Sequence, residues 1–391
     1  MSEQKTWVIP TNELQIGTTL SFDLMDASGN VLHKAGTPIN ERLKERLQKK
    51  NIHSVTVRGE SPISSEVVES IMLSSYSAET VRAIQASISS THRSLCHLIE
   101  NIRTNGVTDS EALSANVHLF VERASQDVSA MLGVISLRNR FSDQAIVDRL
   151  AERSTKISML GVIMSLASGQ TVEAAAEVGL AGLLHDASLL SHPEWFLNST
   201  PHDDKYLAEY RRHPIESAEL LNGIEGISRN TILIITQVHE QADGTGYPRG
   251  LKIEQTLKGA SILNLADAYL ALTTPLQGKQ LAPADAMAYL CYQTALGKFS
   301  KESLQHFLQN MSIYPIGSTV KLDDETSAVV VEGGTGKPLQ PVVRLLGTGN
   351  LRIDLSASSR FISGPYMVGE QGTVERIQKQ QMQQVLWRTD Y

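Results

Sequence analysis

The feature that most constrains this chain is an ordered series of histidine and acidic residues in its central part. The series starts with the adjacent pair His185-Asp186, continues with His213 and His239, and ends with Asp267 inside an apolar stretch. Imidazole and carboxylate groups together favour first-row divalent metals such as iron, manganese or zinc. The series therefore predicts a fold that gathers these side chains around one metal site.

A dense motif lies within the series. From His239 to Pro248 the chain runs His-Glu-Gln-Ala-Asp-Gly-Thr-Gly-Tyr-Pro. With His185-Asp186 upstream, this block resembles the HD-GYP family, the bacterial phosphodiesterases of cyclic di-GMP within the HD metal-hydrolase superfamily. The family pattern His-His-Glu-x-x-Asp-Gly-x-Gly-Tyr-Pro is matched at every fixed position from His239 onward, and Val238 replaces its first His. The resemblance covers residues 143 to 311.

The resemblance implies an all-helical HD-type metal-hydrolase core, and a chain of 391 residues has room for two or three domains. The expected fold class is therefore multi-domain and mainly α, with a small α+β N-terminal module and a β-rich C-terminal extension. The expected divisions are 1–60 for the β-rich module, 61–140 for a helical connector, 141–312 for the HD-GYP domain, 313–370 for the β extension and 371–391 for a tail.

Local patterns predict the elements at both ends. In the N-terminal module, strands flank a turn at 26–30, Asn40 fits the N-cap of a helix over 41–50, and 52–57 alternates like a strand. At the other end, strands are predicted at 319–322, 328–331, 342–346 and 351–355. The glycine-rich segment 333–337 lacks the spacing of a phosphate loop and predicts a hairpin turn.

The connector, from residue 66 to 140, is helical in pattern. His92, His97 and His118 lie in it and are expected to be surface or packing histidines, because no partner carboxylate shares their spacing. Dimerisation through this segment and simple packing on the central domain both fit the pattern.

The resemblance also implies the roles of the central residues. His185, Asp186, His213, His239 and Asp267 are the implied metal ligands, with His185 and Asp186 as the catalytic pair. In the family the Asp bridges two metals that activate a water. The implied cofactor is a divalent metal, iron or manganese foremost, as one or two ions or as none if the site is degenerate. The alternatives are a hydrogen-bonded core pair for His185-Asp186, and a His239 paired with Glu240 or Asp243.

Substrate binding is assigned to Gly246, Tyr247, Pro248 and Arg249. Glycine permits close backbone approach to a ligand, the Tyr247 ring is suited to stacking on a guanine, and Arg249 to meeting phosphates. Arg211 and Arg212 are further candidates for phosphate contact, with plain surface charge as the alternative for all three arginines.

Four departures from the family pattern fall in the site. Arg153 stands where the family has another ligand histidine, and a guanidinium has no lone pair to give to a metal. Val238 replaces a second histidine. After His185-Asp186 the family's Gly and Lys are missing, since Ala187-Ser188-Leu189 follows, and Leu270 replaces an Asp. These departures predict weakened or lost hydrolysis.

Composition limits the partners. A net charge of −7 argues against nonspecific binding of nucleic acid polymers. Two cysteines cannot form a disulfide framework, and no apolar run reaches the ~18 residues of a membrane span, so a cytoplasmic protein is expected.

Three function classes follow: a phosphodiesterase converting cyclic di-GMP to pGpG or GMP, a protein that binds cyclic di-GMP without cleaving it, and an interaction scaffold. A diguanylate cyclase or other signalling protein, and a second copy of the chain, are the partners left open.

Overall fold

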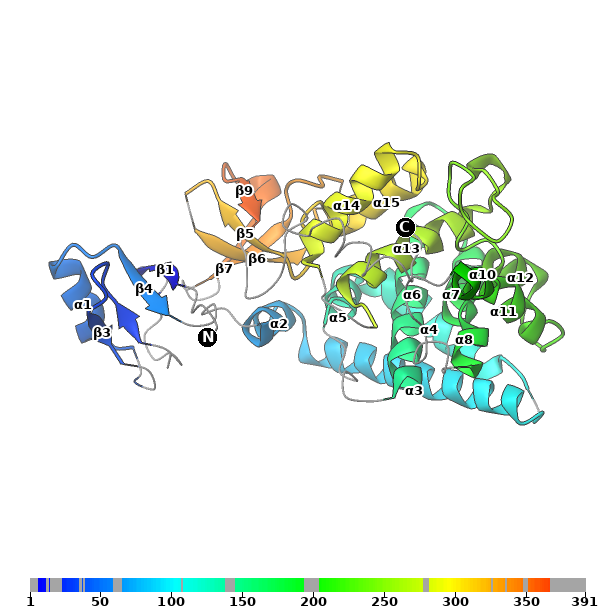
Figure 1. The fold of residues 1–391 in the computed structure, drawn as a ribbon. Coiled ribbons are helices and arrows are strands. Elements are labelled where there is room, and N and C mark those ends of the chain that lie inside the picture. The colour runs from blue at the N-terminus through cyan, green and yellow to red at the C-terminus, as the bar shows by residue number, and fades with distance from the viewer. Residues whose placement is uncertain are drawn as a thin grey trace.

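The computed structural model describes residues 6–11, 14, 23–34, 37, 39–58, 65–106, 108–137, 145–192, 204–276, 281–324, 326–334, 336–346 and 351–365. A small β-rich module at the N-terminus is followed by a large helical body and then by a C-terminal sheet (Figure 1). The expected mainly helical fold class, with β structure at both ends, is confirmed. The predicted tail at 371–391 lies outside the described residues.

The N-terminal module is a sheet closed by one helix. Its elements are β1 (Thr6–Pro10), β2 (Leu24–Met25), β3 (Val31–His33), α1 (Glu41–Lys49) and β4 (Ser54–Arg58). The sheet order is β1-β4-β2-β3, with antiparallel neighbours. Asn40 caps α1 as expected, because its side chain accepts a hydrogen bond from the Leu43 amide at 2.9 Å. Leu43 and Leu47 then turn inward onto a small core of their own.

In its described part, the connector consists of helices joined by short turns. It contains α2 (Ser65–Leu73), α3 (Ala78–Arg103), α4 (Glu111–Gln126) and α5 (Val128–Ile135). α3 begins at Ser77, whose hydroxyl accepts from the Thr80 amide at 3.0 Å. The long helix α3 packs against both α4 and α6, so the connector is part of the main hydrophobic core.

The central domain is a helical bundle around one core. Its elements are α6 (Ile146–Ala167), α7 (Val172–Leu184), α8 (Ala187–Ser191), α10 (Asp204–Tyr210), α11 (His213–Leu221), α12 (Arg229–Ile235), the 3₁₀ turn η2 (Ile253–Gln255), α13 (Lys258–Thr273), α14 (Pro283–Ala295) and α15 (Lys301–Met311). α6, α7 and α13 pack on one another at the centre. Gly161 on α6 and Gly182 on α7 let these two helices lie close to α13. A Cβ at either position would lie within 3 Å of the Leu263 side chain on α13.

The C-terminal sheet rests on the connector. It consists of β5 (Thr319–Leu322), β6 (Ser327–Glu332), β7 (Val342–Leu345), β8 (Arg352–Asp354) and β9 (Ile362–Pro365), with the 3₁₀ turn η3 (Leu355–Ala357), in the order β8-β7-β6-β5-β9. Val329 and Val331 on one face of β6 pack against Val68 of α2. The four predicted strands are confirmed, β9 was not anticipated, and the glycine-rich segment lies in the connection between antiparallel β6 and β7.

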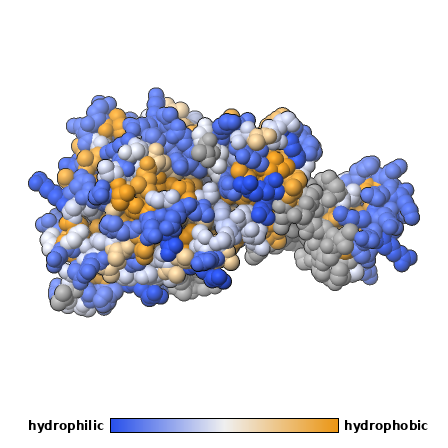
Figure 2. All heavy atoms as spheres, turned by 180° about the vertical axis from the view of Figure 1, so that it is seen from behind, coloured by the Kyte–Doolittle hydropathy of each residue, from blue (hydrophilic) through white to orange (hydrophobic). Residues whose placement is uncertain are grey.

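Seen from behind, hydrophobic residues gather over the middle of the helical body and on the C-terminal sheet (Figure 2). The visible face of the N-terminal module is mostly hydrophilic (Figure 2). No helix in the described ranges combines the length and the apolar character needed to cross a membrane.

Candidate metal-binding active site

The five predicted ligands come together at helix ends and on one central helix. His185 ends α7 and Asp186 precedes α8, so the pair lies at the break between these two helices. His213 opens α11, His239 follows α12, and Asp267 lies in the middle of α13. All five are buried, each with 5% or less of its surface exposed. Buried imidazoles and carboxylates need partners, and here they are partners for one another.

The distances between their polar atoms match the edges of a coordination shell. His213 Nε2 lies 3.0 Å from His239 Nε2 and 3.4 Å from Asp186 Oδ1. His185 Nε2 lies 3.3 Å from Asp186 Oδ2. Two ligand atoms each ~2.1 Å from an ion and at right angles to each other lie about 3.0 Å apart. Two groups are close enough to share an ion: Asp186, His213 and His239 form one, and His185, His239 and Asp267 form the other.

Backbone carbonyls fix the tautomers of two histidines. His185 Nδ1 donates to the Gly182 carbonyl at 2.8 Å, and His213 Nδ1 donates to the Tyr210 carbonyl at 2.8 Å. Because a carbonyl can only accept, both Nδ1 atoms carry the proton, and both Nε2 atoms present a lone pair to the site. This second hydrogen bond is the arrangement that orients a histidine ligand toward a metal.

His239 stands between the two groups. Its Nε2 faces His213, and its Nδ1 lies 3.9 Å from Asp267 Oδ2 without making a hydrogen bond. His185 Nε2 is likewise buried without a hydrogen bond. Burial lowers the pKa of His213, and burial together with the neighbouring His213 lowers the pKa of His239 well below its usual range. Both imidazoles are therefore neutral near pH 7 and able to bind a cation.

Arg153 enters the site from α6. Its guanidinium forms a hydrogen-bonded ion pair with Asp267, in which the side chains are 11% and 2% exposed. Burial alone would lower the pKa of Arg153, but the carboxylates of Asp267 and Asp186 raise it above its ordinary value. Burial alone would raise the pKa of Asp267, but the guanidinium lowers it far below its ordinary value. A permanent cation is thus built into one side of the site.

The other departures from the family pattern lie in the core. Val238 is completely buried, and its carbonyl accepts a hydrogen bond from Asn264 at 2.6 Å. Ser188 is buried, and its hydroxyl donates to the carbonyl of His213 at 3.1 Å. Leu189 and Leu270 are also buried. These residues position the ligand-bearing elements, and they offer no charge to a phosphate.

The glycine-tyrosine-proline loop folds back on His239. A Cβ at Gly246 would lie 2.4 Å from the His239 carbonyl oxygen, so only glycine fits there. The Tyr247 amide donates to that same carbonyl at 3.1 Å. The Tyr247 ring stacks on the His239 ring, with centroids 4.8 Å apart and planes 9° apart. The Glu240 carboxylate accepts hydrogen bonds from the Arg249 and Leu251 amides, each at 2.8 Å. These two bonds fix the end of the loop to the residue after His239.

The pairing of His239 with Glu240 or Asp243, one of the alternatives, is wrong. Glu240 binds backbone amides of the loop, and Asp243 pairs with Lys298 at 3.0 Å. Sequence patterns could not reveal the carbonyl partners at Gly182 and Tyr210, because a carbonyl is present at every residue. The role of Glu240 is visible in sequence only as a fixed position of the motif.

The predicted substrate-binding residues differ in their exposure to solvent. Arg211, Arg212 and Arg249 are exposed, whereas Tyr247 is only 7% exposed. The Arg211 guanidinium carbon lies 5.7 Å from the centre of the Tyr247 ring. Arg249 belongs to the loop and Arg211 lies over its tyrosine, whereas Arg212 pairs with Glu216 at 3.7 Å. One face of the Tyr247 ring is already covered by His239.

Comparisons with known proteins match the part of the chain that contains this site. A family model described as HD domain matches residues 121–299. A cyclic di-GMP phosphodiesterase of Pseudomonas aeruginosa is 30% identical over 46% of this chain and 43% of its own. The cyclic di-GMP phosphodiesterase PdeB of Borreliella burgdorferi is 27% identical over 53% of each chain.

The chain thus spans about half the length of the curated relatives it matches. Among solved structures, an HDG"Y"P protein from Bdellovibrio bacteriovorus is similar at 18% identity with a TM-score of 0.48, over 77% of this chain and 98% of its own. The HD domain match and the similarity to these two phosphodiesterases agree with the resemblance of the motif to the HD-GYP family.

Proposed function

We propose that this HD-GYP family protein binds cyclic di-GMP at the buried histidine-aspartate site, and that it hydrolyses the phosphodiester weakly because Arg153 fills one of the two cation positions. The substrate class rests on the two phosphodiesterases similar to this chain. The weakened hydrolysis rests on one observation, the ion pair between Arg153 and Asp267.

One group of side chains fits a divalent ion without interference. Asp186, His213 and His239 would hold it, since their ligand atoms converge and Arg153 makes its ion pair elsewhere, with Asp267. Two imidazoles and one carboxylate suit iron(II) or manganese(II) and leave coordination positions free. When bound, such an ion would polarise a phosphate oxygen and lower the pKa of a water.

In the second group, the guanidinium replaces a cation. His185, His239 and Asp267 could share an ion by distance, but Asp267 is already neutralised by Arg153. Asp267 then serves as a positioning residue for His239, whose Nδ1 faces its carboxylate at 3.9 Å. A carboxylate behind a histidine raises the basicity of that ligand.

The charge of the site is consistent with an anionic ligand. The two carboxylates and the guanidinium sum to a single negative charge, and one divalent ion would make the site singly positive. A phosphodiester, which carries one negative charge, would then be neutralised. Arg211 and Arg249, which are both exposed, would meet the second phosphate in this proposal, and the buried Tyr247 ring stacks on His239.

The test compares wild type with Arg153→His, which returns a metal-binding side chain to α6. The proteins are loaded anaerobically with manganese(II) or iron(II) and assayed for metal content, for binding of cyclic di-GMP by equilibrium dialysis, and for products by chromatography. Wild type is expected to bind the nucleotide with one ion per chain. Arg153→His is expected to take up a second ion and to turn over about 100-fold faster.

Arg153→Lys is the matched control, because it keeps the positive charge and should gain neither ion nor turnover. Asp186→Ala should lose the metal. Two ions in wild type, or wild-type turnover equal to that of Arg153→His, would contradict the proposal. A folded wild-type protein that binds no cyclic di-GMP would favour an interaction scaffold.

A further inference from the structure

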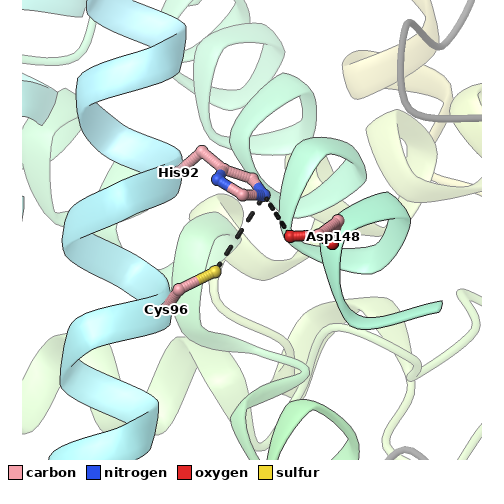
Figure 3. A group of neighbouring side chains, drawn as sticks. All are labelled: His92, Cys96 and Asp148. Atoms are coloured by element: carbon pink, nitrogen blue, oxygen red, sulfur yellow. Dashed lines mark hydrogen bonds and ion pairs between the residues drawn. The ribbon is translucent and has the colours of Figure 1, made fainter. Parts of the chain in front are cut away.

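A second cluster of metal-ligating side chains lies away from the histidine-aspartate site, between α3 and α6 (Figure 3). His92 and Cys96 stand one turn apart on α3, and Asp148 reaches them from the first turn of α6. His92 was expected to be a surface or packing histidine, because no carboxylate shares its spacing in the sequence. Asp148 is far from His92 in sequence, and the packing of α3 on α6 brings the two together.

The three polar atoms converge on one point. His92 Nε2 lies 3.4 Å from Asp148 Oδ1 and 4.0 Å from Cys96 Sγ. One imidazole nitrogen thus faces both the carboxylate and the sulfur (Figure 3). All three ligand atoms lie within 4.8 Å of one another. Around tetrahedral zinc, nitrogen and oxygen ligands lie about 3.3 Å apart, and nitrogen and sulfur about 3.6 Å apart. The distance from His92 Nε2 to Cys96 Sγ is therefore about 0.4 Å longer than in a zinc shell.

The electrostatics of the cluster favour an added cation. Burial, followed by the charge of Asp148, raises the pKa of the Cys96 thiol. Without a cation the sulfur therefore stays protonated beside a carboxylate. A divalent ion would reverse this preference, because a coordinated thiol is deprotonated by the charge of the metal.

We infer that His92, Cys96 and Asp148 form a zinc-binding site that ties the connector helix α3 to the first turn of α6. Mixed nitrogen, sulfur and oxygen donors select zinc over magnesium or calcium. The Asp148 side chain is 32% exposed, so the ion can be reached from solvent, and a water can take the fourth position. The bound ion would hold α6 at a point little more than one turn before Arg153. It would therefore link the connector to the helix that carries Arg153.

Cobalt(II) is the probe, because it takes the place of zinc and gives a sulfur-to-cobalt charge-transfer band when bound by a thiolate. The histidine-aspartate site contains no cysteine and cannot give this band. The full-length chain is titrated with cobalt(II) after removal of metals. Wild type is expected to develop the band in proportion to one bound ion and to lose it on adding zinc(II).

Cys96→Ser and Cys291→Ser form the matched pair. Cys291 is also half-buried with a raised thiol pKa, but it belongs to no such cluster among the described residues. The band should disappear in Cys96→Ser and persist in Cys291→Ser. Asp148→Asn, which keeps the shape and removes the charge, should weaken cobalt binding at least about tenfold.

The inference is overturned by a folded wild-type protein without the band, by a band that depends on Cys291, or by Asp148→Asn binding cobalt as wild type does. Each of these results would leave the three side chains as a hydrogen-bonded packing cluster. The outcome does not depend on whether the protein hydrolyses cyclic di-GMP.

Discussion

At the scale of single residues, one side chain adds a fixed positive charge to the site. A neutral imidazole and a guanidinium occupy similar space, but the first donates a lone pair and the second brings a fixed positive charge. In this chain Arg153 makes its ion pair with Asp267 under almost complete burial. A buried charge that loses its partner is costly, whereas the intact pair is close to neutral for stability.

Arg153→Met tests this argument without reference to catalysis. The substitution keeps an unbranched stem but leaves the Asp267 carboxylate buried without its partner. The free energy of unfolding should fall by about 3–5 kcal/mol, measured by urea denaturation of metal-free protein. Adding Asp267→Asn to the variant removes the orphaned charge and should recover a large part of the loss. Equal losses in the single and double variants would show that packing, and not charge, holds this position.

At the scale of elements, three of the five candidate ligands lie at helix ends, where the chain changes direction. The break between α7 and α8 lets His185 and Asp186 point into the same space, and His213 begins α11 with its carbonyl held by Ser188 of α8. The loop that follows His239 has no regular structure of its own. It is shaped by Glu240, by the Tyr247 stack, and by the absence of a side chain at Gly246.

Gly246→Ala should displace this loop and the ligand histidine beneath it. The new methyl would meet backbone atoms of residues 239 to 241 at 2.2 to 2.7 Å, and backbone cannot move aside cheaply. We expect a loss of about 1–3 kcal/mol in unfolding free energy, together with weaker metal binding at His239.

Gly364→Ala in β9 is the control, because nothing lies within 4 Å of the added methyl. Thermal unfolding and manganese titration of both variants give the comparison. If Gly246→Ala bound metal as tightly as wild type, the loop would not be what positions His239.

The site could be predicted where its residues follow a fixed order in the chain, and not where packing brings distant residues together. The metal-ligating types and the motif from His239 to Pro248 were sufficient to predict that the five candidate ligands converge. The pairing of Arg153 with Asp267 joins α6 to α13, and that of His92 with Asp148 joins α3 to α6. Neither pairing has a local spacing that a sequence pattern could detect.

The strands of the two small sheets follow the same rule. Alternation predicted the four strands from 319 to 355, whereas β1 and β9, which are edge strands, were not anticipated. The side chains of β9 alternate between half-buried and exposed, and the strand contains both Gly364 and Pro365. Its sequence gives little β signal, so its place is set by pairing with β5.

At the scale of the whole molecule, the polar site is embedded in the main hydrophobic core. Val238, next to His239, and Leu270, one turn after Asp267, both belong to that core. Folding of the helical body therefore removes imidazoles and carboxylates from water together. Since the unfolded chain exposes these same groups, the stability of the entire helical body must depend on their protonation.

The stability of metal-free protein should therefore fall as the pH is lowered from 7.5 to 5.5. His213 and His239 have folded-state pKa values below their ordinary value of 6.5. Below pH 6.5 the unfolded chain takes up protons that the folded chain refuses, so the unfolded state gains stability as the pH falls. Each such histidine contributes a slope of about 1.4 kcal/mol per pH unit until its folded pKa is reached.

Urea denaturation at several pH values measures this slope, in wild type, His239→Gln and His97→Gln. His97 is exposed on α3 and serves as the control, so its removal should leave the slope unchanged. His239→Gln should reduce the slope by the share of one histidine. Asp267, whose pKa is lowered, and Arg153, whose pKa is raised, face the same site and keep their charges over this range. A slope unaffected by His239→Gln would mean that this imidazole takes up its proton in the folded state, and that burial beside His213 does not keep it neutral.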